Sequence, residues 1–323
     1  MDRPPAYATS RLARSHTAHG GFARDFVEGL AAHPRRLAPK YFYDTAGSAL
    51  FDHICALPEY YPTRTEIGIL RACSEDIAAC IGPGAQIVEF GAGSVLKIRL
   101  LLDALHSPAG FIPIDISGEH LHAAAAALQR DYPAIPIEPV VGDFTAPITL
   151  PACPAGARRV GFFPGSSLGN FEPDDAIRFL RHAAENLHGG GMLIGIDLVK
   201  DPARLHAAYN DAAGVTAAFN RNVLVRAQRE LGAELAPERF AHYAFYNAPL
   251  RRIEMHLVSE TSQRIVVLGR RFDFTPGDTL HTENSYKYTI DDFRELARSA
   301  GYSPGACWCD PDRSFSLHWL AMQ

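Results

Sequence analysis

The sequence has no long hydrophobic run. None of its apolar stretches approaches the roughly 20 residues that a membrane-spanning helix needs, which argues against that class of protein. The N-terminal segment also lacks the apolar core of a secretory signal, and we expect residues 1–21 to form a polar, mobile lead-in. The expectation from these absences is a soluble, cytoplasmic protein.

Clusters of basic residues are missing as well. The chain has 31 lysines and arginines against 36 acidic residues, a formal net charge of −5, and no stretch is rich in Lys or Arg. Proteins that bind nucleic acid need a concentrated positive patch to neutralise phosphates. We therefore expect neither a nucleic-acid nor a membrane partner.

Cysteine is sparse, with six residues scattered over 323. Cys307 and Cys309 have a spacing that could suggest metal binding, but no second cysteine pair accompanies them. A chain of this length does not need disulfide bonds to be stable. We predict structural cysteines and no metal site.

What the sequence does contain is an alternation of apolar strands with helical segments. The runs VEF, FIPID and LIGID are apolar with little alternation, which is typical of parallel strands covered on both faces. This pattern breaks near Lys200, where helices and then period-2 strands follow, and it returns after Tyr288. We predict an α/β sheet domain made of residues 67–199 plus 288–323. We also predict a smaller α+β substrate-binding domain made of residues 22–66 plus 200–287.

Three of the strands end in groups that could hold a nucleotide-like ligand, and open parallel sheets bind ligands at these ends. The first strand and its turn supply Glu89, Gly91 and Gly93. Asp115 ends the second strand, close to the spacing from the glycine turn at which an acid binds ribose hydroxyls. The third strand ends in Asp143 and Phe144, an acid for an adenine amine and a ring to cover its face.

Two cofactors fit an acid at the end of the second strand, NAD and S-adenosylmethionine (SAM). The pyrophosphate of NAD favours a turn with three glycines, but Leu96 stands at the third position. SAM has no phosphate, and its positive charge suits the neighbouring acids. The C-terminal stretches SPGACWCD and SFSLHWLAM also resemble the closing hairpin of class I methyltransferases. We favour a Rossmann-like class I methyltransferase domain, with a dehydrogenase as the alternative.

Lys97, one turn into the helix after the glycines, has two interpretations. It is either a solvated helix residue or a cation that pairs with the cofactor's carboxylate, and its position alone does not decide between them.

Four further stretches carry more polar and aromatic groups than a scaffold needs. PKYFYD and PEYYPTR place tyrosines in a loop-rich segment, and FFPGSSLGNFEP puts Asn170 at the carboxyl edge, where a methyl acceptor would face the donor. HAAYND and HTENSYKY contribute Tyr209, Glu283 and Ser285. Each of these residues also has an ordinary explanation as a core tyrosine, a turn residue, a helix cap or a solvated acid.

From about residue 22 to the C-terminus, the chain resembles the L-histidine Nα-methyltransferases of ergothioneine biosynthesis. The resemblance is carried by PKYFYDTAGSALFDHICALPEYYPTRTE, LVKDPARLHAAYNDAAGVTAAFNRNVL, RRIEMHL and TENSYKY. It implies SAM as methyl donor, free L-histidine as substrate, threefold methylation of its α-amine to hercynine, and a monomer.

The resemblance also implies a role for each candidate residue. The residues expected to contact SAM are Gly91, Lys97, Asp115, Asp143 and Phe144, with Glu89 and Gly93 from the strand-turn motif. Those expected to contact histidine are Tyr60 and Tyr209 at the carboxylate, Asn170 at the amine, Glu283 and Ser285 at the imidazole, Tyr43 nearby, Met255 shaping the pocket and Asn284 through its backbone.

Three alternatives stay open at this point. The enzyme could methylate another free amino acid such as tryptophan, the protein could bind SAM or amino acids without catalysis, or it could be the dehydrogenase considered above. Glu283, Ser285 and Met255 favour histidine, and the presence of both cofactor and acceptor groups favours an enzyme.

Overall fold

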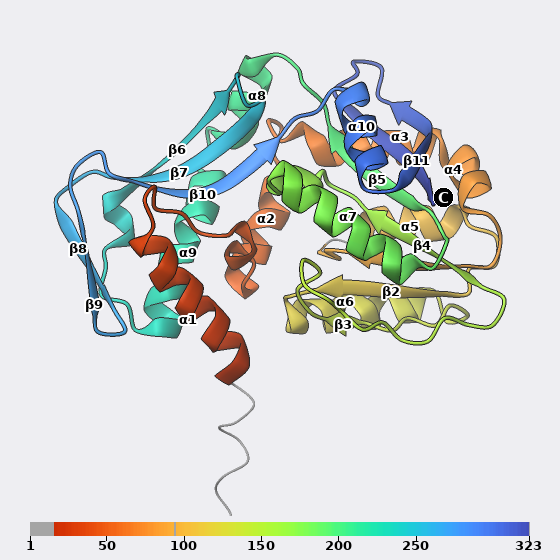
Figure 1. Ribbon diagram of the computed structural model, residues 1–323, viewed down its shortest axis with the longest axis horizontal. Coiled ribbons are helices and arrows are strands. Elements are labelled where there is room, and N and C mark those ends of the chain that lie inside the picture. The colour runs from red at the N-terminus through yellow and green to blue at the C-terminus, as the bar shows by residue number, and fades with distance from the viewer. Residues whose placement is uncertain (1–15, 94, 323) are drawn as a thin grey trace, which may run out of the picture. The chain divides into compact units, whose positions relative to one another are not determined.

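A seven-stranded sheet forms the centre of the larger of two units of the chain (Figure 1). The computed structural model describes residues 16–93 and 95–322. The strands of this sheet are β1 (Ala85–Phe90), β2 (Gly110–Asp115), β3 (Val140–Val141), β4 (Arg158–Phe163), β5 (Met192–Asp197), β11 (Tyr302–Cys309) and β12 (Phe315–Met322). They lie in the order β11-β12-β5-β4-β1-β2-β3.

The sheet is parallel from β3 to β5 and closes with an antiparallel pair. β1 pairs in parallel with β2 and β4, β2 with β3, and β4 with β5. β12 runs antiparallel to both β5 and β11. The predicted parallel-rich α/β sheet is confirmed. The strand order reverses between β1 and β4, and open α/β sheets bind ligands at the carboxyl ends of the strands beside such a reversal.

Helices cover both faces of this sheet. Successive residues of a strand point to opposite sides, so neighbouring residues of one strand belong to different cores. Ile87 belongs to a core with α3 (Tyr61–Ala72), α4 (Ser74–Ile81), α5 (Val95–Ala104) and α6 (Gly118–Asp131). Its neighbour Val88 belongs to a second core with α7 (Pro173–Leu187) and α10 (Ile290–Ser299), which lie in front of the sheet in Figure 1. This double cover explains why the strands read as continuous apolar runs.

Two elements differ from what their sequence patterns predict. The run IGILRACSEDIAACIG (residues 67–82) predicts a single helix, but the chain forms two, α3 and α4, because Cys73 between them has φ = −120° and ψ = 21°, outside helical values. The run IEPVVGDF predicts a longer third strand, but only Val140–Val141 form one. Pro136 and Pro139 precede it and cannot donate to a ladder, which shortens the pairing.

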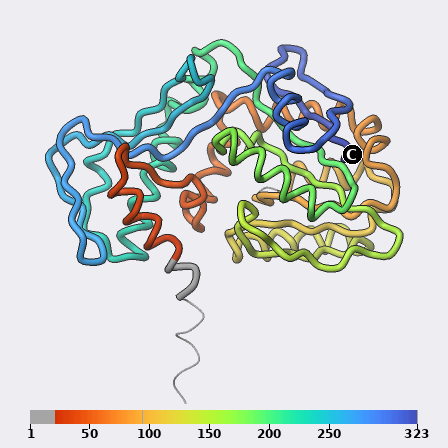
Figure 2. The backbone as a smooth tube through the Cα atoms, in the orientation of Figure 1, coloured from red at the N-terminus to blue at the C-terminus, as the bar shows by residue number. Residues whose placement is uncertain are grey.

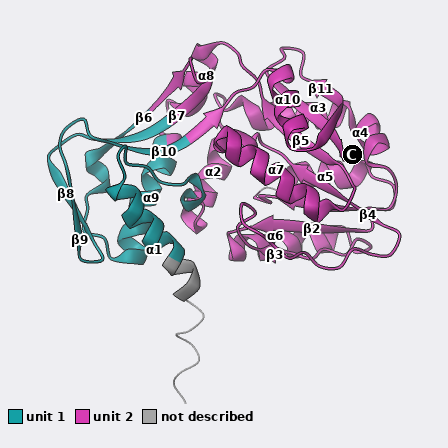
Figure 3. Cartoon of the chain, in the orientation of Figure 1, with its two compact units in different colours: residues 1–42, 217–243, 255–283 teal, residues 43–216, 244–254, 284–323 magenta. Residues whose placement is uncertain are grey.

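The smaller unit comprises described residues 16–42, 217–243 and 255–283 (Figure 3). It contains α1 (His16–Ala31), η1 (Pro39–Phe42), most of α9 (Val215–Leu231), η3 (Pro237–Arg239), β8 (Gln263–Val267) and β9 (Arg270–Phe274). Aromatic pairs fill its interior, with ring centroids 4.7 Å apart for Phe42 and Phe219 and 5.3 Å apart for Phe240 and Phe274. Most of the expected N-terminal lead-in, residues 1–15, lies outside the described residues.

The division into units follows the chain differently from the domains expected above. Residues 43–66 and 200–216, with α2 (Thr45–Ala56) and α8 (Pro202–Tyr209), group with the larger unit. The strands β6 (Phe240–Asn247), β7 (Arg252–Ser259) and β10 (Thr279–Tyr286) form a sheet in the order β10-β7-β6 and contribute residues to both units. After β10 the chain returns to the large sheet through α10, β11 and β12 (Figure 2).

Within residues 16–93 and 95–322, no helix combines the length and the apolar character that crossing a membrane requires.

Candidate functional site

The turn after β1 carries the chain across to the end of β2. The amides of Gly91 and Ala92 both donate to the carbonyl of Ile114, each at 2.9 Å, and Gly91 has φ = +77°. Glycine adopts this conformation without the strain that a side chain would bring. A Cβ at Gly91 would lie 3.4 Å from Cε1 of Phe144. Two predicted cofactor residues from different strand ends therefore lie side by side.

The ring of Phe144 is part of a packed aromatic group. Its centroid lies 5.6 Å from that of Phe163, 5.7 Å from Phe179 and 6.4 Å from Phe90, all edge to face. These arrangements suit the charge distribution of aromatic rings. The packing holds the Phe144 ring in place beside Gly91.

The two predicted acids Asp115 and Asp143 follow β2 and β3 as expected. Asp115 accepts a hydrogen bond from the Ser117 amide at 2.7 Å. Burial raises the pKa of the Asp115 carboxyl, although the hydrogen bond from Ser117 acts in the opposite direction. Asp143 accepts from both the amide and the hydroxyl of Thr145, at 3.0 and 2.5 Å, which fixes its carboxylate in a tight turn.

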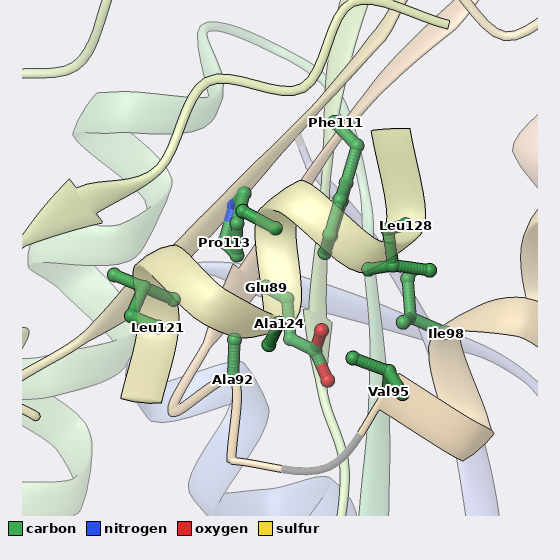
Figure 4. A pocket seen from close by; sticks show the side chains of 10 residues that line it. Glu89, Ala92, Val95, Ile98, Phe111, Pro113, Leu121, Ala124 and Leu128 are labelled. Carbon is green, nitrogen blue, oxygen red and sulfur yellow. The ribbon is translucent and has the colours of Figure 1, made fainter. Parts of the chain in front are cut away.

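Glu89 lies inside a pocket beside the first turn of α5 rather than at an open strand end (Figure 4). Its carboxylate is surrounded by apolar side chains that include Ala92, Val95 and Ile98. The residue is only 2% exposed, and this burial raises the pKa of Glu89 well above its ordinary value, against the attraction of Lys97. Glu89 is thus a carboxyl whose charge the surroundings disfavour.

Gly93 is held through its backbone. Its amide donates to the Gly91 carbonyl at 2.9 Å, and its own carbonyl oxygen lies 2.8 Å from Nε2 of His120. Leu96, at the position of a third glycine, is 45% exposed. The first turn of α5 therefore presents a leucine side chain where a dinucleotide site would have none.

Lys97 is buried and paired. Its ammonium lies 2.6 Å from Oε2 of Glu66, a fully buried residue of α3. The Gly165 amide donates to both carboxylate oxygens of Glu66, at 3.1 and 2.9 Å. The interpretation of Lys97 as a solvated helix residue is therefore wrong. Glu66 links it to the turn after β4.

That turn leads into the short helix η2 (Ser167–Asn170), which contains the predicted amine ligand Asn170. The Ser166 hydroxyl accepts a hydrogen bond from the Asp197 amide at 2.9 Å, which ties the turn to the end of β5. A Cβ at Gly169 would lie 2.8 Å from the Tyr286 carbonyl oxygen, so only glycine allows η2 to approach the end of β10 this closely. Asn170 is thus placed next to both strand ends.

Tyr209 and Ser285, two predicted substrate residues, are in direct contact. The Tyr209 hydroxyl donates to Oγ of Ser285 at 2.7 Å. The ammonium of Lys287 donates to Ser285 at 2.7 Å and to the Tyr209 oxygen at 3.3 Å, and it pairs with Oδ2 of Asp197 at 2.8 Å. Burial opposes the charge on Lys287, but the attraction of Asp197 prevails and raises the pKa of the lysine. These four residues form one buried polar network.

A second lysine extends this network. Lys200 donates to Oδ1 of Asp197 at 2.5 Å and to the Tyr61 hydroxyl at 2.6 Å, and Tyr61 donates to both Asp197 oxygens. Burial would raise the pKa of Asp197, but Lys287 and Lys200 together hold it below its ordinary value. Burial also lowers the pKa of Lys200 to about 8, with Asp197 acting in the opposite direction. Two cations thus share one carboxylate.

Tyr43 and Tyr60 both contact one aromatic ring. The centroid of Phe51, in α2, is 5.6 Å from that of Tyr43 and 6.2 Å from that of Tyr60. Tyr60 immediately precedes α3, next to Tyr61 of the polar network. The structure therefore gathers the predicted tyrosines into a partly buried aromatic surface in the larger unit.

Asn284 points to the face of β10 opposite to Ser285, because strand residues alternate. Its side chain donates to Oε1 of Glu172 at 2.8 Å, and the Tyr286 hydroxyl donates to Oε2 of the same residue at 2.6 Å. Glu172 fixes the Asn284 side chain from the segment that follows η2. The contact of the Asn284 backbone with substrate stays a prediction.

The remaining two candidates, Met255 and Glu283, belong to the smaller unit. Met255 is 1% exposed, and its carbonyl accepts a hydrogen bond from the Thr282 hydroxyl at 3.1 Å. Glu283 is buried, and its carbonyl oxygen lies 3.0 Å from Nε2 of His281. Their contact with the residues of the larger unit stays a prediction.

Comparison with known proteins identifies the family. The model of the histidine-specific, SAM-dependent methyltransferases matches residues 22–322. The chain is 44% identical to the histidine N-alpha-methyltransferase of Mycolicibacterium smegmatis, over 91% of this chain and 92% of that protein. It is 42% identical to the protein of the same name from Mycobacterium tuberculosis, over 94% and 95% respectively. The chain belongs to the histidine-specific methyltransferase family. The resemblance inferred from the sequence, SAM as the methyl donor included, is confirmed.

A more distant relative of this histidine-specific methyltransferase is a longer protein. Ergothioneine biosynthesis protein 1 of Neurospora crassa is 30% identical over 89% of this chain but only 33% of its own length.

Sequence reasoning missed several polar residues of this methyltransferase that lie at or beside the strand ends. They are Glu66, Asp197, Lys200, Lys287 and Glu172. One of them had a signal: LIGID ends in an acid at the carboxyl edge, as FIPID does, and the rule that selected Asp115 also selects Asp197. The others had no such signal, because Lys200 pairs with Asp197 itself, and Glu66, Glu172 and Lys287 have partners that are distant in the chain.

Proposed function

We propose that the protein catalyses SAM-dependent trimethylation of the α-amine of free L-histidine to hercynine, the first step of ergothioneine biosynthesis. Membership of the histidine-specific methyltransferase family supports the substrate and the cofactor. The structural observation that carries the proposal is the meeting of the Asn170 helix with the Tyr209–Ser285 pair around the end of β5. These are the groups expected to hold a free amino acid.

The carboxyl ends of β1, β2 and β3 carry residues that suit SAM. Gly91 leaves open the space beside the Phe144 ring, because a side chain there would contact the ring and strain the backbone. When bound, SAM supplies an electrophilic methyl group on a positively charged sulfur. Seven residues of the chain would hold it, namely Glu89, Gly91, Gly93, Lys97, Asp115, Asp143 and Phe144.

The nucleophile must be the neutral amine of histidine. An α-amine in a model peptide has a pKa of roughly 7.7–8.0, so a proton must leave before each methylation. The Asn170 side chain can accept a hydrogen bond from an N–H and so orient the nitrogen lone pair, but an amide cannot take the proton. Water is the acceptor that we favour for it, with weak help from a neighbouring tyrosine.

Each methylation enlarges the amine and ends in a permanent cation. Aromatic faces stabilise such a cation by roughly 0.5–2 kcal/mol. The tyrosine-rich surface around Tyr43, Phe51 and Tyr60 suits this requirement.

We assign substrate selectivity to residues that contact the two ends of the amino acid. Tyr60 and Tyr209 would hold the carboxylate, while Glu283 and Ser285 would bind the imidazole, with Met255 shaping the pocket and Asn284 contributing its backbone. A carboxylate that accepts an imidazole N–H favours histidine over tryptophan, the runner-up substrate, only when a second group reads the other ring nitrogen. The smaller unit would supply Glu283 and Met255, as the substrate-binding domain of a cytoplasmic monomer.

The test is direct. The purified protein is incubated with SAM and L-histidine, and the products are followed by mass spectrometry. The expected result is a ladder of three successive methyl additions to histidine, with one equivalent of S-adenosylhomocysteine for each. Tryptophan and a reaction without protein serve as controls. Absence of the histidine ladder, or a faster ladder on tryptophan, would overturn the proposal.

A further inference from the structure

Lys287 donates to three acceptors at once. Its ammonium reaches Oδ2 of Asp197 at 2.8 Å, Oγ of Ser285 at 2.7 Å and the hydroxyl oxygen of Tyr209 at 3.3 Å. A charged lysine carries three protons and no lone pair. Every proton therefore has an acceptor, and Lys287 can only donate to the two hydroxyl groups.

This arrangement fixes the direction of the Ser285 hydroxyl. Its oxygen accepts from Lys287 and, at 2.7 Å, from the hydroxyl of Tyr209. A hydroxyl group has two acceptor positions and one proton. With Tyr209 donating to it, both acceptor positions of Ser285 are occupied, and across the residues that the structure describes its proton has no acceptor. When a bound carboxylate takes the Tyr209 proton instead, Lys287 still donates to Ser285, and the Ser285 proton remains available to the ligand.

Asp197 prevents Lys287 from accepting the Ser285 proton. An uncharged lysine has a lone pair and could accept the Ser285 proton, but the ion pair with Asp197 holds Lys287 in its charged form. Asp197 in turn is held by Tyr61 and Lys200 through its other oxygen. The Lys287 side chain is 1% exposed, so water does not replace these partners.

We propose that Lys287 is a positioning residue that holds Ser285 as an obligate hydrogen-bond donor to an unprotonated ring nitrogen of the methyl acceptor. The inference rests on the proposed function, in which Ser285 contacts the imidazole. A neutral imidazole offers one N–H and one nitrogen lone pair, whereas indole and phenyl rings offer no ring acceptor. A ring without an acceptor leaves the buried Ser285 proton unpaired, which disfavours its binding.

The experiment couples a change in the ligand to a change at Lys287. Dissociation constants are measured by calorimetry for L-histidine and for the two pyrrolylalanines, histidine analogues in which one or the other ring nitrogen is replaced by C–H. The ratio between the better pyrrolylalanine and histidine is the selectivity for the ring acceptor. For the wild type we expect a ratio of about tenfold or more, since a buried donor is left unpaired.

Lys287→Gln should reduce this ratio to below about threefold. The glutamine oxygen can accept the Ser285 proton, so Ser285 no longer has to donate it to the ligand. Lys287→Arg keeps a donor-only cation and should retain most of the wild-type ratio. A merely structural role of Lys287 would weaken both ligands alike and leave the ratio unchanged in Lys287→Gln, which would overturn the inference.

Ser285→Ala provides a test that keeps both lysines and Asp197 in place, should Lys287→Gln not fold. It removes the proton itself, so the ratio should again fall below about threefold. An undiminished ratio in Ser285→Ala would also overturn the inference. Failure of the wild type to bind histidine would instead contradict the proposed function, so the two failures are distinguishable.

Discussion

The ammonium of Lys97 and the carboxylate of Glu66 lie 2.6 Å apart, and the Glu66 side chain has no exposed surface. α5 supplies the lysine and α3 the glutamate, and the same carboxylate accepts from the Gly165 amide. Lys97, a predicted cofactor residue, is therefore connected through one buried acid to the turn that leads into η2. The connection joins the strand ends of β1 and β4.

Removing Lys97 should destabilise the protein strongly. Lys97→Met leaves Glu66 as a buried charge without a cation, and breaking a buried pair in this way lowers the free energy of unfolding by about 3–5 kcal/mol. The double variant with Glu66→Gln should lose less than Lys97→Met alone, because no unpaired charge remains. Urea unfolding of the two single variants and the double variant measures the coupling.

The matched control is Arg298→Ala, which removes an exposed ion pair with Glu295 and should change stability by less than about 1 kcal/mol. Equal losses in Lys97→Met and in the double variant would show that the pair does not act as described.

The parts of the site that the sequence predicted are those governed by local rules. Asp115, Gly91 and Phe144 follow strands whose apolar runs are visible in the sequence, and parallel strands bring their carboxyl ends together. Glu66 could not be predicted, because it lies in a helix of ordinary pattern and its amide partner Gly165 is 99 residues away. The direction of Ser285 likewise depends on Asp197, which approaches only in the folded chain.

Glu89→Gln should make the protein more stable at neutral and alkaline pH. The buried Glu89 has a raised pKa, so its contribution to stability is present below the ordinary value of about 4.3 and is lost as pH rises through the raised value. Glutamine does not titrate, so the stability gained by the variant should grow with pH over that window. Thermal unfolding of both proteins across the acid to alkaline range measures the difference. A gain that is constant or shrinks with rising pH would contradict the assignment.

Tyr209→Phe should mainly raise KM for histidine. The variant removes a hydroxyl that bonds Ser285 and Lys287 and that we assign to the substrate carboxylate. Binding of this kind is shared by the ground state and the transition state, so KM should rise about tenfold while kcat changes little. Steady-state kinetics with histidine measure both values.

Tyr302→Phe is the matched control for Tyr209→Phe. It removes another buried tyrosine hydroxyl, which donates to the Leu180 carbonyl in the sheet core, and it should leave KM unchanged. A large fall in kcat at constant KM in Tyr209→Phe would count against a role in carboxylate binding.

Glu283→Ala should remove most of the activity toward histidine. A buried carboxylate that accepts the imidazole N–H discriminates strongly, and kcat/KM for histidine should fall by roughly a hundredfold or more. Selectivity should relax toward phenylalanine, whose ring has no N–H and would leave the wild-type carboxylate unpaired. Competition between histidine and phenylalanine for limiting SAM gives the change in selectivity directly. Glu260→Ala, which removes an exposed acid of the same unit, should leave both quantities unchanged. Wild-type histidine kinetics in Glu283→Ala would place the imidazole elsewhere.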